Sequence, residues 1–389
     1  MATFCHVCQT GQTVELLGFR DLYRVSSDCL PLPNGGKLLA CASCCTVVTQ
    51  IDVGWRDMVA KIYKDYSVYA QSNGADELSF SSEGLTTPRS KKILEFVAPH
   101  VRSIQGTWLD FGCGNGSFLR NISESFTSVT LIGMEFDDHY RSEVTQIPRV
   151  LDLVTDWDHS SLENLRVVSM IHVLEHIEDP LVLLNKIRCR LQNDGILIIE
   201  VPHIWSNPYV LTVGDHATHF DLPSLLRLVR TAGFEILRKS VDLIPGELTV
   251  VAQKPALVEV TDSETEIPFE PEQNIGEKYA ANAQGLIDGL VRVSDWLHEK
   301  REQSDSMGIF GTSIGGTWAG TTIKQSHDFW VDENSTRWGQ PWLGKQIIPV
   351  TEVPNDSFIA FVLGPQKARD VVHRLECSTN AFLIGMPPM

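Results

Sequence analysis

A glycine-rich turn is the strongest chemical signal in this sequence. Residues 109–116 read Leu-Asp-Phe-Gly-Cys-Gly-Asn-Gly, so that Gly112, Gly114 and Gly116 follow a short apolar run that contains Asp110. Glycine permits positive φ angles and lets a ligand approach the backbone closely. We therefore expect a strand that turns sharply into a helix and holds a ligand at the turn. Asp110 is placed to accept hydrogen bonds from turn amides or from a cationic amino group.

The residues after this turn narrow the choice of ligand. Glu135 ends the next apolar run, about twenty residues after the glycine turn. In nucleotide-binding folds, an acid at this distance from the turn pairs with the ribose hydroxyls. The Gly-x-Gly-x-Gly spacing is tighter than the dinucleotide fingerprint, and it serves a pyrophosphate less well. The alternative is a nucleotide-binding fold of another kind, or glycines that only turn the chain.

Cysteines cluster near the N-terminus. Six of the nine lie in residues 1–45, and four of them form two Cys-x-x-Cys pairs. In a reducing compartment such clustering indicates metal binding rather than disulfides. Four thiolates suit a structural zinc ion, which leaves no open position for a substrate. The expected ligands are Cys5, Cys8, Cys41 and Cys44, with Cys45 as an alternative to Cys44 and four unligated or redox-active thiols as the competing interpretation.

Histidines form the third candidate group. His172 and His176 follow a buried run at 167–171, and His216 and His219 lie just before Asp221. Histidine titrates near neutral pH and suits a general base. We expect His172 to line a site and His176 to pack. For His216 and His219, the alternative role is to brace the helix that Asp221 is predicted to cap.

Alternating strands and helices are predicted around these residues. Short runs rich in β-branched residues alternate with amphipathic stretches, which is typical of a parallel sheet covered on both faces. A late strand at 249–253 is expected to be antiparallel or at an edge. The other predicted strands are 107–111, 129–135, 166–171 and 195–201, and the predicted helices are 88–100, 117–125, 180–191 and 222–233.

The sequence pattern of the C-terminal third predicts a separate α/β unit. Residues 255–277 are acidic and proline-containing, which is typical of a linker. A long helix is predicted at 275–301. Strands follow at 309–311, 328–331 and 358–363, around a second glycine-rich turn at 308–316.

Composition limits the function classes. The chain has 389 residues, 43% of them hydrophobic, and suits two or three globular domains. A net charge of -17 repels nucleic-acid phosphates and anionic membranes. The sequence contains neither a long apolar run nor a secretory signal pattern. We expect a cytoplasmic protein, monomeric or homodimeric, that acts on a small molecule and on neither nucleic acid nor membrane.

The sequence resembles the class I S-adenosylmethionine-dependent methyltransferases in three features: the glycine turn, Glu135 and the run His172-Val173-Leu174-Glu175-His176. The resemblance implies that the three turn glycines approach the methionine part of the cofactor and that Glu135 binds its ribose. It also implies that Asp156 and Trp157 flank the adenine. Tyr66 and Tyr69 are candidates to close over the cofactor, although their spacing of three is also that of a helix face.

Over nearly the full length, the order of elements resembles the deoxysugar C-methyltransferases, which methylate a ring carbon of nucleotide-linked keto sugars. The points of resemblance are the paired Cys-x-x-Cys knuckles, the tyrosines of 63–69, the turn, the run 215–221, and Gly308–Gly316 with Asp332. The implied fold class is α/β, with a Rossmann-like methyltransferase core. The implied domains are a zinc-binding domain at 1–75, the cofactor-binding domain at 76–255, an acidic linker at 256–274 and a C-terminal α/β domain at 275–389.

This resemblance assigns roles to the histidines. The family carries a Glu-His-x-x-Tyr-Phe type run whose histidine is the proposed base, and His216 matches it. Asp215 replaces the glutamate and His219 replaces the tyrosine of the sugar site. The base would remove a proton next to a carbonyl, and the enolate would attack the sulfonium methyl group.

Other functions stay open at this point. An O- or N-methyltransferase acting on a sugar or another small metabolite fits the same motifs. A non-catalytic binding or assembly protein that retains the cofactor fold is the non-enzyme alternative. Three roles are open for the second glycine-rich turn at 308–316. It could bind a phosphate, contact the substrate, or only join a strand to a helix.

Overall fold

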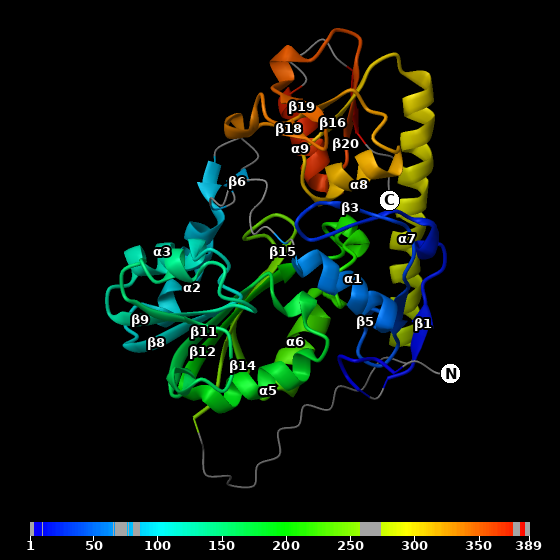
Figure 1. Cartoon of the computed structure of the whole chain (residues 1–389). Coiled ribbons are helices and arrows are strands. Elements are labelled where there is room, and N and C mark those ends of the chain that lie inside the picture. The colour runs from blue at the N-terminus through cyan, green and yellow to red at the C-terminus, as the bar shows by residue number, and fades with distance from the viewer. Residues whose placement is uncertain are drawn as a thin grey trace.

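The computed structural model describes residues 4–9, 11–64, 66, 76, 78–80, 86–256, 274–375 and 382–385. Figure 1 shows an N-terminal segment, a central sheet covered by helices and a C-terminal α/β unit, with the long helix α7 beside the first and the last of these. Tyr69 and nearly all of the predicted linker 256–274 lie outside the described residues. Among the described helices, none is long and apolar enough to cross a membrane.

The central sheet has seven strands in the order β10-β9-β8-β11-β12-β15-β14. The first five are parallel, and β15 runs antiparallel to both of its neighbours. The strands are β8 (Gly106–Phe111), β9 (Val129–Met134), β10 (Val150–Val154), β11 (Leu165–Ile171), β12 (Leu191–Pro202), β14 (Glu235–Ser240) and β15 (Glu247–Gln253).

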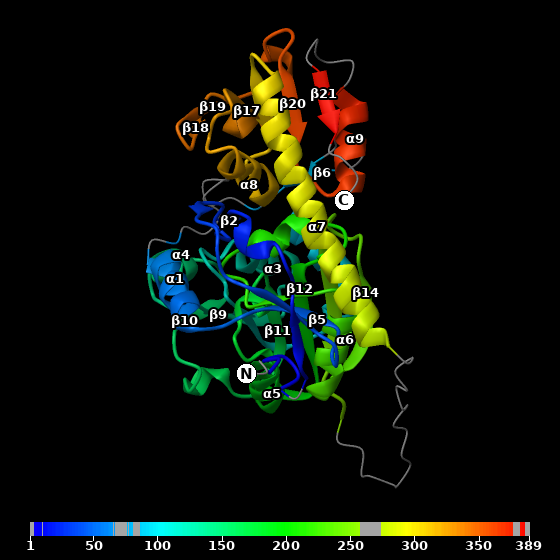
Figure 2. The same cartoon turned by 90° about the vertical axis from the view of Figure 1, so that its right-hand side faces the viewer.

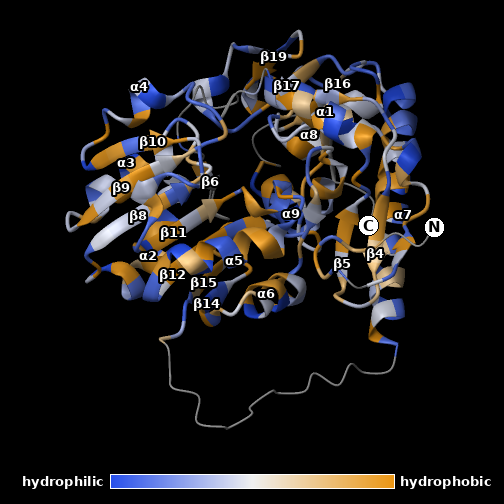
Figure 3. Cartoon of the chain, turned by 60° about the horizontal axis from the view of Figure 1, so that its bottom comes forward, coloured by the Kyte–Doolittle hydropathy of each residue, from blue (hydrophilic) through white to orange (hydrophobic). Residues whose placement is uncertain are grey.

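Each face of this sheet packs on its own helices. Trp108 and Val167 share one hydrophobic cluster with α2 and α3, whereas Leu109 and Val168 share another with α5 and α6. This alternation follows from the two-residue period of a strand. In Figure 3, β11, β12 and α5 are predominantly hydrophobic. The helices are α2 (Arg89–Val101), α3 (Ser117–Ser125), α4 (Arg141–Val144), α5 (Pro180–Arg190) and α6 (Leu222–Thr231).

The structure confirms the four predicted parallel strands and adds two that the sequence pattern missed. Both missed strands, β10 and β14, lie at the edges of the sheet. Only two residues of β10 and none of β14 are buried, so their hydrophobic pattern is weak. The late strand β15 is antiparallel, as predicted, but it lies inside the sheet. Helix α5 ends one residue earlier than predicted, because Leu191 adopts an extended backbone and begins β12.

The N-terminal segment builds a four-stranded sheet in the order β1-β4-β5-β13. Its last strand comes from far along the chain, because Thr218 and His219 pair antiparallel with Val48 and Val47. Two small hairpins, β2-β3 and β6-β7, complete this region. The elements are β1 (Thr13–Glu15), β2 (Arg24–Val25), β3 (Pro31–Leu32), β4 (Leu38–Cys41), β5 (Thr46–Thr49), α1 (Val53–Lys64), β6 (Leu78–Phe80), β7 (Thr86–Pro88) and β13 (Thr218–His219).

The C-terminal part begins with helix α7, which Figure 2 shows passing along both the N-terminal and the C-terminal regions. Ile287 of α7 shares a hydrophobic cluster with Phe19 of the N-terminal segment and with Trp318 of α8. The sheet that follows is parallel except for β18. Its order is β18-β19-β17-β16-β20-β21. The elements are α7 (Ile275–Gln303), β16 (Met307–Phe310), α8 (Ile314–Thr322), β17 (Phe329–Val331), β18 (Pro341–Trp342), β19 (Lys345–Ile348), β20 (Phe358–Phe361), α9 (Pro365–Leu375) and β21 (Phe382–Gly385).

Asp221 caps α6, as predicted. Its carboxylate accepts a hydrogen bond from the backbone N–H of Ser224 at 2.8 Å, and Ser224 Oγ accepts one from the N–H of Asp221 at 3.1 Å. This reciprocal capping box satisfies two backbone donors at the start of the helix. The Asp221 carboxylate also accepts a bond from Trp205 Nε1 at 3.1 Å.

We predict that Asp221→Ala lowers the free energy of unfolding by about 1–2 kcal/mol, because the helix loses its side-chain cap. Urea unfolding followed by far-ultraviolet circular dichroism measures this change. Asp295→Ala, on the exposed face of α7, is the matched control and should stay within about 0.5 kcal/mol of the wild type. Equal stability of the two variants would contradict the capping role.

Candidate active site

Four parallel strands end at one edge of the central sheet and deliver most of the predicted site residues there. The glycine turn follows β8, Glu135 follows β9, Trp157 lies just after β10, and His172 follows β11. In open α/β sheets, ligands bind outside the carboxyl ends of the strands. The topology therefore brings the separate sequence signals to one side of the molecule.

Positive backbone φ angles explain the glycines of the turn. The φ angles are 74° at Gly112, 50° at Gly114 and 79° at Gly116. A Cβ atom on Gly112 would lie 2.4 Å from Val173 Cγ2, and one on Gly116 would lie 2.6 Å from Ile147 Cδ1. The turn is thus packed too closely for any side chain at these two positions.

Glu135 lies over this turn. One carboxylate oxygen accepts a hydrogen bond from the N–H of Gly114 at 2.8 Å, and the other accepts one from the N–H of Phe136 at 3.1 Å. Burial raises the pKa of this carboxyl group. The acid expected to bind ribose is therefore adjacent to the turn.

Asp110 is held inside the sheet. Its carboxylate accepts a hydrogen bond from Ser169 Oγ at 2.6 Å, and only 3% of the residue is exposed. Burial raises its pKa to about 7. Asp110 thus links β8 to β11 directly below the turn.

The predicted adenine-flanking pair divides into one packed and one exposed residue. The Trp157 ring lies 5.9 Å from the Phe111 ring, and the Arg190 guanidinium lies 6.0 Å above the indole. Asp156 is exposed and accepts a hydrogen bond from the N–H of Asp158 at 3.0 Å.

Tyrosines from the N-terminal segment face this edge. The ring centroid of Tyr63, near the end of α1, lies 5.4 Å from that of Phe136 and 6.3 Å from that of His176. The Tyr66 ring lies 5.3 Å from the Tyr63 ring. Burial raises the pKa of both phenols, so both are protonated at neutral pH. Tyr63, which the sequence analysis named only among the tyrosines of 63–69, contacts Phe136 on the turn side and His176 on the histidine side.

Three histidines form a continuous group. The ring of His216 lies 4.8 Å from that of His176 and 5.7 Å from that of His219. Burial, together with neighbouring histidines, lowers the pKa of His216 well below its ordinary value and that of His219 to about 3. Both rings are therefore neutral at physiological pH, with a nitrogen lone pair available.

His172 lies in a different, strongly charged environment. Glu175, Glu200 and Glu247 all lie within 3.6 Å of its ring nitrogens, and Arg89 contacts the same ring. Burial and Arg89 act to lower its pKa, but the glutamates prevail and raise the pKa to about 10. Its backbone φ of 54° is unusual for a residue with a side chain. His172 is therefore cationic, unlike His216 and His219.

The sequence analysis missed Arg89, Glu200 and Glu247. Glu200 carried a signal, because it is a charged residue within an apolar strand, where an unpaired charge is costly. Arg89 and Glu247 come from α2 and β15, and only the tertiary structure shows that they meet Glu200.

The four predicted zinc-ligand cysteines lie together. Their sulfur atoms are all within 4.8 Å of one another, and the Cys5–Cys44 and Cys8–Cys41 Sγ distances are 3.6 and 3.8 Å. A Cβ atom on Gly11 would lie 2.4 Å from Cys41 Sγ, so this glycine leaves room for the cluster. Hydrogen bonds from Cys44 and Cys5 lower the pKa of the Cys41 thiol.

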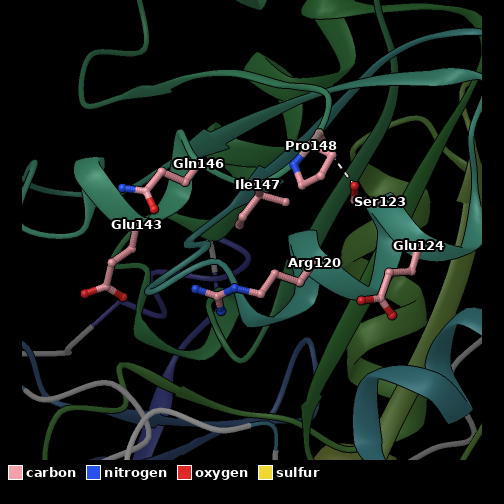
Figure 4. Close-up of a pocket in the computed structure, with 7 residues that line it drawn as sticks. All are labelled: Arg120, Ser123, Glu124, Glu143, Gln146, Ile147 and Pro148. Carbon is pink, nitrogen blue, oxygen red and sulfur yellow. Dashed lines mark hydrogen bonds between the residues drawn. The ribbon is translucent and has the colours of Figure 1, made fainter.

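A hollow of about 340 Å³ lies between α3 and the segment around α4. Figure 4 shows its lining, where Ser123 Oγ donates a hydrogen bond to the carbonyl of Pro148 at 2.7 Å. None of the predicted site residues lines it.

Residues 85–239 match the family model of a methyltransferase domain. Similar solved structures include the 1,6-didemethyltoxoflavin-N1-methyltransferase of Burkholderia thailandensis, which is 15% identical over 54% of this chain and 96% of that one, with a TM-score of 0.39. Another is an S-adenosylmethionine dependent methyltransferase from Mesorhizobium loti, which is 16% identical over 44% of this chain and 100% of that one, with a TM-score of 0.35. At this identity and TM-score, neither structure indicates which molecule accepts the methyl group in this protein. No curated protein matches the sequence.

The matched domain covers the glycine turn, Glu135 and the histidines, and it coincides with the parallel sheet. The chain therefore contains a methyltransferase domain.

Proposed function

We propose that this enzyme methylates a small molecule, namely a ring carbon of a nucleotide-linked keto-deoxysugar, with His216 as the base. One observation carries the proposal: the neutral ring of His216 lies next to His176, which is joined through Tyr63 to Phe136 beside Glu135. A proton acceptor and the turn edge thus belong to one continuous group of side chains.

The residues around the turn fit the cofactor. Gly112, Gly114 and Gly116 would receive its methionine part, and Glu135 its ribose, with Asp110 bracing the turn from below. Asp156 and Trp157 would flank the adenine, and Tyr66 would cover the bound molecule, with Tyr69 as the second tyrosine of that pair. When bound, S-adenosylmethionine supplies an electrophilic methyl group.

His216 would accept the proton from the substrate carbon next to the carbonyl, and the electron pair of that C–H bond moves into the enolate. The enolate carbon would then form the new bond to the methyl group while the methyl–sulfur bond breaks and leaves its electron pair on sulfur, and the proton would leave His216 for solvent. The negative charge that develops on the enolate favours the imidazolium form of His216. His219 and the cationic His172 would line the substrate site on either side.

We also propose that Cys5, Cys8, Cys41 and Cys44 hold a structural zinc ion. The grouping of four sulfur atoms supports this, as do backbone N–H groups that point at sulfur: Gly11 N–H donates to Cys8 Sγ at 3.3 Å and Cys44 N–H to Cys41 Sγ at 3.5 Å. The ion would fix the segment that carries Cys5 and Cys8 to the end of β4.

Replacing Glu135 with glutamine should weaken S-adenosylhomocysteine binding about tenfold or more, because a neutral amide accepts ribose hydroxyl bonds less strongly than a carboxylate. Isothermal titration calorimetry measures the affinity. Glu124→Gln, in the hollow of Figure 4, is the same chemical change away from the turn and should bind normally. Equal affinity for the two variants would remove Glu135 from the cofactor site.

For the cysteines, the full chain dialysed against a weak chelator should retain about one zinc per molecule, because four thiolates bind zinc tightly. Cys41→Ser should lose this zinc, whereas Cys189→Ser, at an exposed position outside the cluster, should keep it. Atomic emission spectroscopy gives the metal content. A folded wild-type protein without zinc would contradict the assignment.

The base assignment predicts solvent exchange at carbon. In heavy water without methyl donor, the enzyme should introduce deuterium next to the carbonyl of a nucleoside-diphosphate keto-deoxysugar, and His216→Gln should slow this at least about 100-fold. His139→Gln, an exposed histidine, is the control. Mass spectrometry reports the label. Absence of exchange, together with methyl on oxygen or nitrogen in the product, would favour an O- or N-methyltransferase instead.

A further inference from the structure

We propose that Glu175, His176 and His216 form a second metal site, separate from the four cysteines, for a borderline divalent cation such as zinc or cobalt(II). One ligand atom from each of the three lies within 4.8 Å of the other two. Ligands around a tetrahedral zinc ion lie about 3.4 Å apart. Small side-chain shifts would bring all three onto one ion. The site does not depend on the proposed acceptor, although it shares His216 with the proposed function.

The burial of the Glu175 carboxylate without hydrogen-bond partners in the described part of the chain indicates a cation. The residue is 1% exposed, and neither of its carboxylate oxygens has a hydrogen-bond partner among the described residues. His172 Nδ1 faces Oε1 at 3.3 Å as an ion pair. A buried carboxylate is costly unless it is paired and hydrogen-bonded, or coordinates a metal. A cation at Oε2 would complete the charge balance.

His176 is oriented as a metal ligand is. Its Nδ1 lies 3.1 Å from the backbone carbonyl of Asp215, so Nδ1 carries the proton and Nε2 keeps its lone pair. The Asp215 carboxylate lies 3.4 Å from the same nitrogen. That carboxylate is fixed by Ser27, whose N–H and Oγ donate to it at 2.8 and 2.5 Å. A carboxylate or carbonyl behind the ring is the usual second layer of a histidine metal site.

His216 supplies the third ligand from a different element. No hydrogen bond joins its ring nitrogens to a residue in the described part of the chain, and the ring meets that of His176 edge-on at 87°. The single 3-10 turn η4 (Leu174–His176) presents Glu175 and His176, while the strand pairing of β13 holds His216 opposite them.

The donor set determines the class of ion. Two imidazoles and one carboxylate suit zinc and cobalt(II), and three protein ligands leave a position for water or a substrate oxygen. The cysteine cluster offers four sulfur ligands and no such opening. The two sites therefore differ in chemistry and in spectrum.

X-ray absorption on the full chain distinguishes the two sites. With one equivalent of zinc, we expect sulfur neighbours at about 2.3 Å, and with a second equivalent, added nitrogen and oxygen neighbours at about 2.0 Å. Cobalt(II) added to the protein with one zinc should give visible ligand-field bands without the intense thiolate charge-transfer band. If a second equivalent stays unbound at micromolar protein, the proposal is wrong.

Two variants locate the second ion. Glu175→Gln and His176→Gln should each weaken binding of the second metal equivalent by about 100-fold or more, since each removes a direct ligand. Glu178→Gln, which changes a partly exposed glutamate in the same loop that pairs with Arg56, should bind both equivalents normally. If Glu175→Gln fails to fold, His176→Gln and the wild-type absorption data still decide the question. Normal second-ion binding by His176→Gln would overturn the site.

Activity is a separate readout, and it tests the proposed role of His216 rather than the site. One lone pair cannot both bind an ion and accept a proton. Loss of carbon-bound deuterium exchange when the second equivalent binds therefore agrees with His216 as the base. Gain of activity on loading would instead remove His216 as the base and leave the metal site standing.

Discussion

The antiparallel pairing of β13 with β5 is the contact on which the site depends. Thr218 and His219 complete a sheet whose other strands come from the first fifty residues. Thr49 Oγ1 donates to the carbonyl of His216 at 2.6 Å, and His6 Nε2 lies 3.0 Å from Thr218 Oγ1. The cysteine cluster at one end of this sheet and the histidines at the other are thereby parts of one rigid unit.

Other contacts fix the loop that leads into this strand. Trp55 Nε1 donates to the carbonyl of Gly214 at 2.9 Å, and the N–H of Gly214 donates to the carbonyl of Val25 at 2.8 Å. Residues 213–221 are buried along their full length. A buried segment must have its backbone polar groups satisfied. The N-terminal segment provides many of those partners, so the methyltransferase domain and this segment form the candidate active site jointly.

Burial gives chemically similar residues opposite charges in this site. His216 and His219 are buried beside other histidines, so desolvation keeps them neutral. His172 is partly exposed, and three glutamates outweigh Arg89 and keep it protonated. Buried ion networks contribute little net stability, because desolvation offsets their attraction. This network is better understood as a device for placing a fixed positive charge at the carboxyl edge of the sheet, where the left-handed backbone of His172 also stores strain.

Local sequence was sufficient for features that depend on neighbouring residues. The spacing of Gly112, Gly114 and Gly116 predicted the turn after β8, because only glycine adopts those φ angles freely. The buried strands and the cap of α6 at Asp221 followed from hydrophobic period and capping chemistry. The edge strands β10 and β14 were missed, since half-exposed strands lack a strong hydrophobic pattern.

The tertiary structure alone decided which distant side chains meet. Glu200 is a charged residue within an apolar strand, and its partners Arg89 and Glu247 come from other elements. His176 was expected to pack, yet the fold sets it between Tyr63 and His216. The sequence determined local backbone conformation and the ligand types available. The long-range pairing of β13 with β5 determined their geometry, and no local pattern encodes a contact between residues 48 and 218.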